Sequence, residues 1–187
     1  MARCYSVPVP ERYPSLTRLW LLTDARNDAA LEAALARLPR GSGLVLRHYH
    51  LPEAQRRARF RVLARVARRF GHCVVLSGSA AQARRWGADG AYGAAARLTR
   101  GPVLLRLVTA HSLRELGEAR RARADAVLLS PVWPSASHPG GKALGTLRFR
   151  LLSQRAGLPV IALGGMNLPR ARALKPAAWA AIDGLST

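Results

Sequence analysis

Long apolar runs are scarce in this chain of 187 residues. No run approaches the roughly 18 consecutive apolar residues of a membrane-spanning helix. The first residues, Met1 to Ser6, also lack the apolar segment of a secretory signal. Cysteine is scarce too, since Cys4 and Cys73 are the only two and do not have the spacing of a metal site. We therefore expect a cytoplasmic protein in a reducing compartment, with no membrane partner.

Acidic residues and lysines are few, so the charge is strongly unbalanced. Thirty residues are Lys or Arg and ten are Asp or Glu, which gives a formal net charge of +20. Such a charge can indicate a nucleic-acid partner. The Arg-rich segment from Glu53 to Phe70 has an apolar helical stripe, but its basic face has no interleaved aromatic residues for base stacking. We interpret it as a helix that covers a sheet with its arginines in water, and we expect no nucleic-acid partner. The only lysines are Lys142 and Lys175, so the charge also fits the residue bias of a GC-rich genome.

Short apolar runs alternate with amphipathic segments along the whole chain, as in parallel α/β proteins. Eight runs have the length of buried strands, and the alternation with short connections predicts a single (β/α)8 TIM barrel of the α/β class over residues 1–187. Little sequence follows the eighth run, so we expect a compact barrel with a shortened C-terminus. The eight runs are Leu19–Asp24, Gly43–Arg47, Cys73–Leu76, Ala88–Tyr92, Val103–Val108, Ala126–Leu129, Pro159–Leu163 and Trp179–Ile182.

Two of the predicted strands lead into loops that are typical of ligand sites. Ala126–Leu129 is followed by Ser130 to Gly141, a stretch of hydroxyls, prolines and glycines with one histidine. Pro159–Leu163 is followed by Gly164-Gly165-Met166-Asn167. Because the carboxyl ends of parallel strands meet at one edge of the sheet, we expect both loops to form part of one site.

Several motifs, in their order and spacing, resemble those of the thiamine-phosphate synthase and thiazole tautomerase (TenI-like) family. The resemblance runs from Leu19 to Leu185, and it agrees with the barrel predicted above. The motifs are Leu22-Thr23-Asp24, Leu46-Arg47, Gly87-Ala88-Asp89-Gly90, Thr109-Ala110-His111-Ser112-Leu113, Ala124-Asp125, Ser130-Pro131-Val132-Trp133-Pro134-Ser135 and Ile161-Ala162-Leu163-Gly164-Gly165-Met166.

The resemblance implies an activity and a set of site residues. The family's synthase joins hydroxymethylpyrimidine diphosphate to hydroxyethylthiazole phosphate and releases pyrophosphate, with Mg²⁺ on the diphosphate. Arginine can grip phosphate through two hydrogen bonds, hydroxyls donate without adding charge, and glycine lets the backbone approach an oxyanion. The implied residues are Arg47 and Thr109 at the diphosphate, Ser135 and Ser137 at the diphosphate and thiazole phosphate, and the backbone N–H groups of Gly164 and Gly165 at the thiazole phosphate.

The resemblance fails at the metal ligands. Where the family has acidic residues after its third and fourth strands, this chain has Gly78 and Arg97. Mg²⁺ on a diphosphate usually requires one or two carboxylates. Only Asp24 and Asp183 are placed at the ends of predicted strands, and Asp183 would repel a phosphate. We therefore assign no metal ligand, although the family implies Mg²⁺ as a cofactor.

Three functions remain open. In the first, a synthase-type transferase, Arg47, Arg97, His138 and Lys142 replace Mg²⁺ in neutralising the leaving diphosphate. In the second, a TenI-like acid/base enzyme acts on a thiazole phosphate, and His138 shuttles a proton because an imidazole titrates near pH about 6.5. In the third, the barrel binds phosphorylated thiamine precursors without turnover. His111 is expected to be a hydrogen-bonded residue beneath the site. A homo-oligomer is compatible with all three.

Overall fold

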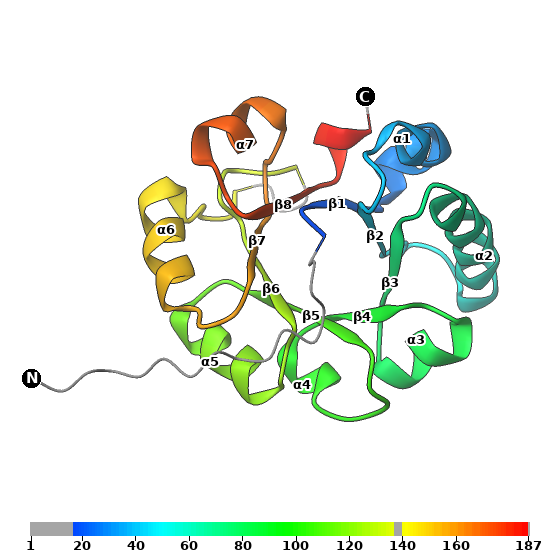
Figure 1. Cartoon of the computed structure of the whole chain (residues 1–187), viewed down its shortest axis with the longest axis horizontal. Coiled ribbons are helices and arrows are strands. Elements are labelled where there is room, and N and C mark those ends of the chain that lie inside the picture. The colour runs from blue at the N-terminus through cyan, green and yellow to red at the C-terminus, as the bar shows by residue number, and fades with distance from the viewer. Residues whose placement is uncertain (1–16, 137–139, 187) are drawn as a thin grey trace, which may run out of the picture.

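The computed structural model describes residues 17–136 and 140–186. Eight parallel strands pair in sequence order, and β8 pairs with β1 to close a barrel (Figure 1). The predicted (β/α)8 TIM barrel is therefore confirmed. The strands are β1 (Leu19–Leu22), β2 (Gly43–Leu46), β3 (Cys73–Ser77), β4 (Gly90–Gly93), β5 (Leu105–Ala110), β6 (Ala126–Leu129), β7 (Val160–Ala162) and β8 (Ala178–Ala181).

Helices surround the barrel and cover the outer faces of its strands (Figure 1). Three of them begin at a polar residue whose side chain accepts a hydrogen bond from a backbone N–H in the first turn: Ser79, Ser112 and Asn167. Such caps satisfy N–H groups that have no partner within the helix. The helical elements are η1 (Ala25–Ala30), α1 (Leu31–Arg37), α2 (Glu53–Arg69), α3 (Ala80–Trp86), α4 (Ala95–Leu98), α5 (Leu113–Arg121), α6 (Gly145–Arg155), α7 (Leu168–Leu174) and η2 (Asp183–Leu185).

Alternate residues of each strand enter two separate apolar layers. In β2, Val45 belongs to the layer inside the barrel, together with Trp20 and Val75. Its neighbours Leu44 and Leu46 belong to the layer between the strands and the helices. Successive side chains of a strand point to opposite faces. The uninterrupted apolar run of β2 is thus what a strand covered on both faces requires.

The turn after β1 ties the first strand to the last. Asp24 caps η1, and the buried side chain of Asn27 donates to the carbonyl oxygens of Leu22, at 3.0 Å, and Ile182, at 3.1 Å. Leu22 is the last residue of β1, and Ile182 directly follows β8. Asn27 therefore fixes the carboxyl ends of two strands that are far apart in the sequence.

Strand β5 lies two residues later than predicted. Val103, which we expected to begin it, is 75% exposed, and the strand runs from Leu105 to Ala110. The backbone N–H of Arg106 donates to the carboxylate of Asp125 at 2.8 Å, which fixes the start of the strand. Thr109 consequently belongs to the strand itself.

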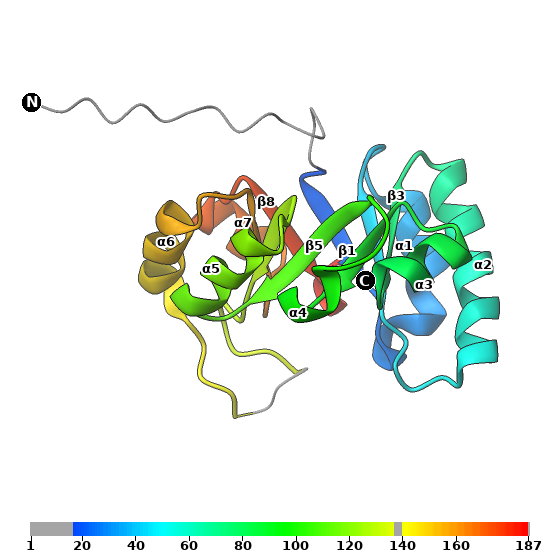
Figure 2. The ribbon, with the colours of Figure 1, turned by 90° about the horizontal axis from the view of Figure 1, so that it is seen from below.

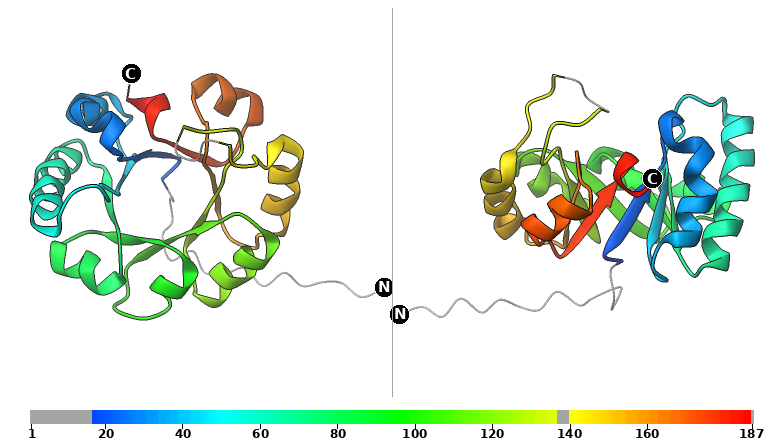
Figure 3. Two further views of the ribbon diagram at one scale, coloured as in Figure 1. Left: turned by 180° about the vertical axis from the view of Figure 1, so that it is seen from behind. Right: turned by 90° about the horizontal axis from the view of Figure 1, so that it is seen from above.

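The α2 helix stands on the outer side of the barrel (Figure 2). Phe60 and Leu63 are buried against the strands, whereas Arg57, Arg61 and Arg65 are exposed, as the sequence predicts. In the described ranges no helix is both long enough and apolar enough to cross a bilayer. On another side of the molecule, the described parts of the β6–α6 connection extend beyond the barrel (Figure 3). Because this connection follows β6, it projects from the carboxyl ends of the strands.

Candidate functional site

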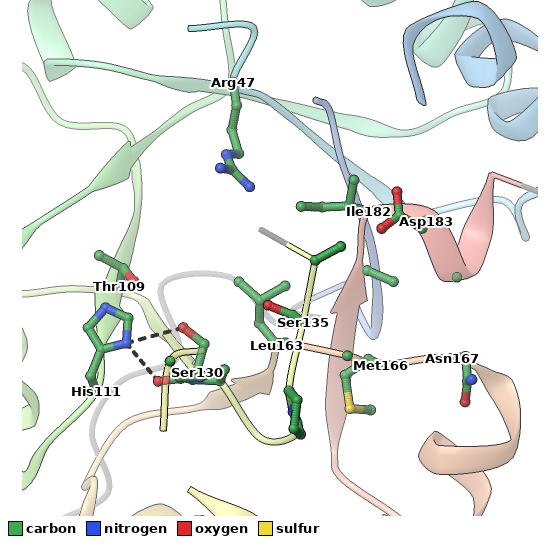
Figure 4. A pocket seen from close by; sticks show the side chains of 18 of the residues that line it. Arg47, Thr109, His111, Ser130, Ser135, Leu163, Met166, Asn167, Ile182 and Asp183 are labelled. Carbon is green, nitrogen blue, oxygen red and sulfur yellow. Dashed lines mark hydrogen bonds between the residues drawn. The ribbon is translucent and has the colours of Figure 1, made fainter. Parts of the chain in front are cut away.

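A cavity of about 1040 Å³ opens at the carboxyl ends of the strands. Its wall consists of residues at the ends of, or just after, β2, β4, β5, β6, β7 and β8. The side chains of Arg47, Thr109 and Ser135 are directed toward the same space from three different parts of the chain (Figure 4). This end of a (β/α)8 barrel is where such folds bind their ligands.

Six of the predicted site residues lie in the cavity wall. The fold brings them together from four separate segments of the chain, and their roles toward a ligand stay predictions. They are Arg47, Thr109, Ser135, Lys142, Gly164 and Gly165.

Three other predicted residues are not part of this wall as described. Arg97 is exposed on the single turn of α4, because Ala95 and Leu98 take the buried positions of that turn. The described cavity wall does not include Arg97, and its contact with a ligand stays a prediction. Ser137 and His138 lie outside the described residues.

A chain of buried hydrogen bonds fixes the backbone at Arg47. The backbone N–H of Arg47 donates to the Thr23 hydroxyl at 2.8 Å, and that oxygen lies 2.6 Å from His48 Nδ1. His48 Nε2 lies 2.7 Å from the carboxylate of Asp28. A carboxylate can only accept, so Nε2 carries the proton and the Thr23 hydroxyl donates to Nδ1. Burial lowers the pKa of His48 more than Asp28 raises it, which keeps the ring neutral.

The Thr23, His48 and Asp28 chain has the connectivity of a hydrolase triad but not its exposure. The side chain of Thr23 is fully buried, and Thr23 is absent from the cavity wall. A nucleophile must reach its substrate. We therefore interpret the chain as support for the loop after β2, where His48 has a positive φ of 37°.

Two tyrosines add hydroxyl groups beside Arg47. Tyr49 Oη lies 2.5 Å from Ser77 Oγ, and the Arg47 guanidinium lies over the Tyr49 ring at 5.4 Å. Tyr92, near the end of β4, is buried and lines the cavity. Burial raises the pKa of Tyr92, and a hydrogen bond with Thr109 only partly offsets this effect. Its hydroxyl thus keeps its proton at neutral pH and can donate to an anion.

His111 also lines the cavity, with its ring in one defined tautomer. Its Nδ1 lies 2.6 Å from the carbonyl oxygen of Ser130. Because a carbonyl only accepts, Nδ1 carries a proton, and Nε2 is an acceptor in the neutral ring. The expectation that His111 lies beneath the site is corrected, since His111 is part of its wall.

On the opposite side, glycines form the wall. Gly164 has φ of 93°, and a Cβ atom there would lie 2.5 Å from the Cα of Pro131. Gly165 has φ of 61°, and its Cβ would lie 2.6 Å from the carbonyl oxygen of Pro134. Only glycine fits both the left-handed backbone and the close contact. Neither N–H group has an acceptor among the described residues, so both are available to a ligand.

The donor set of the wall fits an anion better than it fits Mg²⁺. Asp183 is the only carboxylate in the described part of the wall, and it pairs with Arg26 at 3.5 Å. No three His, Cys, Asp or Glu residues within the described ranges are grouped so that they could hold a metal ion. Gly78 offers no ligand atom, and Arg97 is a cation. The described residues thus do not fit a Mg²⁺–diphosphate site of the usual kind, and we assign no residue to a metal.

Sequence reasoning did not single out the two tyrosines. Tyr92 ends a predicted strand and Tyr49 follows one by two residues, so both stand at carboxyl ends where a barrel builds its site. Their position at the carboxyl ends of predicted strands was the one sequence signal that could have identified them as site residues. It is weak, because most residues at strand ends serve the turn alone.

Fold and cavity together define a (β/α)8-barrel protein whose ligand site is rich in hydrogen-bond donors. The sequence pattern of the family described as thiamine monophosphate synthase matches residues 19–185. The chain belongs to this family, whose role is in thiamine biosynthesis.

Individual relatives agree with this assignment. The thiamine-phosphate synthase of Mycobacterium avium (strain 104) is 31% identical in a match that covers 82% of this chain and 78% of the relative. A protein of Aquifex aeolicus (strain VF5), whose name also contains "thiamine-phosphate synthase", is 36% identical over 59 residues, which is 32% of either chain. Among solved structures, the thiamine phosphate pyrophosphorylase of Pyrococcus furiosus has a TM-score of 0.74 at 21% identity and covers 90% of both chains. At that identity the likeness supports the fold alone.

Proposed function

We propose that this protein couples hydroxymethylpyrimidine diphosphate to hydroxyethylthiazole phosphate and releases pyrophosphate. The observation that carries the proposal is the cavity, which has anion-binding groups on two opposite sides. Arg47 and Thr109 line the cavity after β2 and in β5, and Gly164 and Gly165 line it after β7. A reaction between a diphosphate and a second phosphorylated substrate needs two such places in one space.

The residues present suggest how the step would proceed. The thiazole nitrogen forms a bond to the methylene carbon of the pyrimidine, while the bond from that carbon to the diphosphate oxygen breaks. The leaving pyrophosphate keeps the electron pair, so negative charge on its oxygens must be stabilised. Arg47 would donate to those oxygens, together with one hydroxyl of the hydrogen-bonded pair Thr109 and Tyr92, and all three line the cavity. Ser135 and the two glycines would hold the thiazole phosphate in position.

A coupled assay tests this proposal. The full chain is incubated with both substrates, with and without Mg²⁺, and thiamine phosphate is separated by chromatography and oxidised to fluorescent thiochrome. We expect product that requires both substrates. If both substrates bind, as judged by thermal shift, and no thiamine phosphate forms under either condition, the protein is a binder and the proposal is wrong.

His111 supports a second candidate, an acid/base enzyme acting on a thiazole phosphate. Its Nδ1 proton is committed to Ser130, so in the neutral ring Nε2 can accept a proton inside the cavity. His138, the histidine predicted for this role, lies outside the described residues. If the second candidate holds, the protein incubated with thiazole phosphate alone in deuterated water catalyses exchange of acidic protons on the substituents of the thiazole ring for deuterium. The variant His111→Gln should abolish this exchange. The synthase proposal expects no such exchange without the pyrimidine substrate.

A further inference from the structure

One side of the cavity is built from cations and hydroxyls where a metal-dependent site would need carboxylates. We define the arginine rim as five residues. Arg47, Tyr49 and Tyr92 line the cavity, and Arg56 and Ser77 support them from outside its wall. All five stand at the carboxyl ends of β2, β3 and β4 or reach those ends from α2. None is acidic. The carboxylates that interact with these arginines, Asp24 and Glu53, lie outside the described cavity wall, so a divalent cation in the cavity would be repelled by the guanidinium groups and would have no carboxylate ligand from the rim.

The guanidinium of Arg47 is the cationic group of the arginine rim that is available to a ligand. It lies over the Tyr49 ring at 5.4 Å and lines the cavity. Within the described ranges it takes part in no hydrogen bond and no ion pair. Its backbone, by contrast, is held by Thr23 at 2.8 Å. Because its backbone is fixed and its guanidinium N–H groups have no acceptor among the described residues, Arg47 is suited to a bidentate contact with phosphate.

Arg56 has the opposite arrangement, because its donors are already committed to the protein. Its Nε donates to the carbonyl oxygen of Arg47 at 2.8 Å, and its Nη2 donates to the carbonyl oxygen of Ser77 at 2.5 Å. Its guanidinium lies between the rings of Tyr49, at 5.7 Å, and Trp86, at 5.6 Å. Arg56 therefore links the ends of β2 and β3 and positions Arg47.

The charge of Arg56 adds to the field of the rim. Burial lowers the pKa of its guanidinium, whereas Tyr49 and Glu53 raise it, and Arg97 has a smaller lowering effect. Arginine stays charged at neutral pH even so. Arg97 thus adds positive charge near the rim from outside the described cavity wall. An anion bound at the rim would relieve this concentration of positive charge.

We propose that the arginine rim binds a diphosphate directly and without a divalent cation. Arg47 grips the phosphate oxygens, the hydrogen-bonded hydroxyls of Tyr92 and Thr109 together supply one O–H donor, and Arg56 is a positioning residue. This inference rests on the proposed function for its ligand class. The inference requires only that a diphosphate binds, whereas the proposed function also requires that the two substrates are coupled.

Titration calorimetry of the full chain with inorganic pyrophosphate tests this inference. The titration is run in buffer with EDTA and then with Mg²⁺, at equal ionic strength because phosphate binding is strongly screened by salt. We expect binding in EDTA that Mg²⁺ does not strengthen. Binding that appears only with Mg²⁺, or no binding under either condition, would overturn the inference.

Variants separate the two arginines. Arg47→Ala should weaken pyrophosphate binding by about 10- to 100-fold, the range expected for charge-assisted hydrogen bonds. Arg57→Ala is the matched control, because Arg57 is exposed on α2 next to Arg56 and its removal changes the net charge by the same amount as Arg47→Ala. It should change the affinity by less than about twofold. Equal losses in the two variants would contradict the inference. Melting temperatures establish that each variant is folded, and Arg47→Lys replaces Arg47→Ala if the alanine variant unfolds.

A double-mutant cycle tests the positioning role of Arg56. If Arg56 acts through Arg47, Arg56→Ala weakens binding in the normal chain but has little further effect in the Arg47→Ala background. Independent, additive losses would refute that role. The coupling assay is judged separately. Metal-free pyrophosphate binding without product formation would refute the proposed function and leave this inference standing. Product formation together with pyrophosphate binding that strictly requires Mg²⁺ would refute this inference and leave the proposed function standing.

Discussion

The two sides of the cavity achieve anion binding by different means. On the side of β7 and β8, the backbone of Gly164 and Gly165 approaches so closely that no side chain fits. On the other side, the arginine rim depends on side chains that contact other side chains and the backbone at the strand ends. The first arrangement constrains the identity of single residues. The second constrains a network, in which one member can change if another compensates.

The largest expected effect comes from adding a methyl group on the glycine side. In Gly164→Ala the new Cβ would lie 2.5 Å from the Cα of Pro131 at a backbone φ of 93°. Strain and overpacking together should cost about 2–5 kcal/mol of unfolding free energy and abolish binding of thiazole phosphate. Urea denaturation and calorimetry measure the two effects.

Gly41→Ala is the matched control, since Gly41 has a similar φ of 80° but open space around a Cβ. It should cost only the backbone strain, about 1 kcal/mol, and leave binding unchanged. Equal destabilisation by the two substitutions would show that close approach is not what selects glycine at position 164.

A smaller loss of stability is expected from Thr23→Val, which removes the support of Arg47 in the arginine rim. The valine leaves the backbone N–H of Arg47 and Nδ1 of His48 without their partner, at a cost of about 1–3 kcal/mol. Pyrophosphate affinity should fall as well, because the backbone of Arg47 is released. Thr99→Val serves as the control, since Thr99 is exposed, and should change stability by less than about 0.5 kcal/mol. Unchanged affinity in Thr23→Val would separate this network from ligand binding.

The buried imidazole of His48 should make stability depend on pH. Burial lowers its pKa below the ordinary value of 6.5, so the unfolded chain binds a proton more readily than the folded one. Stability is then complete above pH 6.5 and is lost as the pH falls through the folded pKa. Melting temperatures between pH 8 and pH 5 should show this loss in the normal chain and in the exposed-site variant His50→Gln, but not in His48→Gln. An unchanged pH profile in His48→Gln would refute the assignment.

The sequence was sufficient to predict the barrel, because its alternating apolar runs and helical stripes are local signals that agree along the whole chain. It also placed Gly164 and Gly165, whose doublet directly follows a strand. It could not place Arg56 at the rim, because that role depends on contacts with the ends of β2 and β3, far away in sequence. Nor could it show that Arg97 lies outside the described cavity wall, because a position along the chain does not give the direction of a side chain.

The smallest expected effect concerns the carboxylate that opposes an anion. Asp183→Asn removes the negative charge of the described cavity wall and should tighten binding of thiazole phosphate by about two- to fivefold, in line with a partly exposed charge pair. Glu118→Gln, on α5 and outside the cavity wall, should have no effect on binding. Weaker binding in Asp183→Asn would show that this carboxylate contributes to ligand binding instead of opposing it.

The central claim is that distant donors converge on one anion in a single cavity. Crystals soaked with pyrophosphate in the presence of EDTA test it most directly. The account predicts pyrophosphate density inside the cavity against Arg47 and Thr109, with no metal peak between its phosphate groups. Pyrophosphate bound only at the exposed arginines of α2, with the cavity empty, would contradict it.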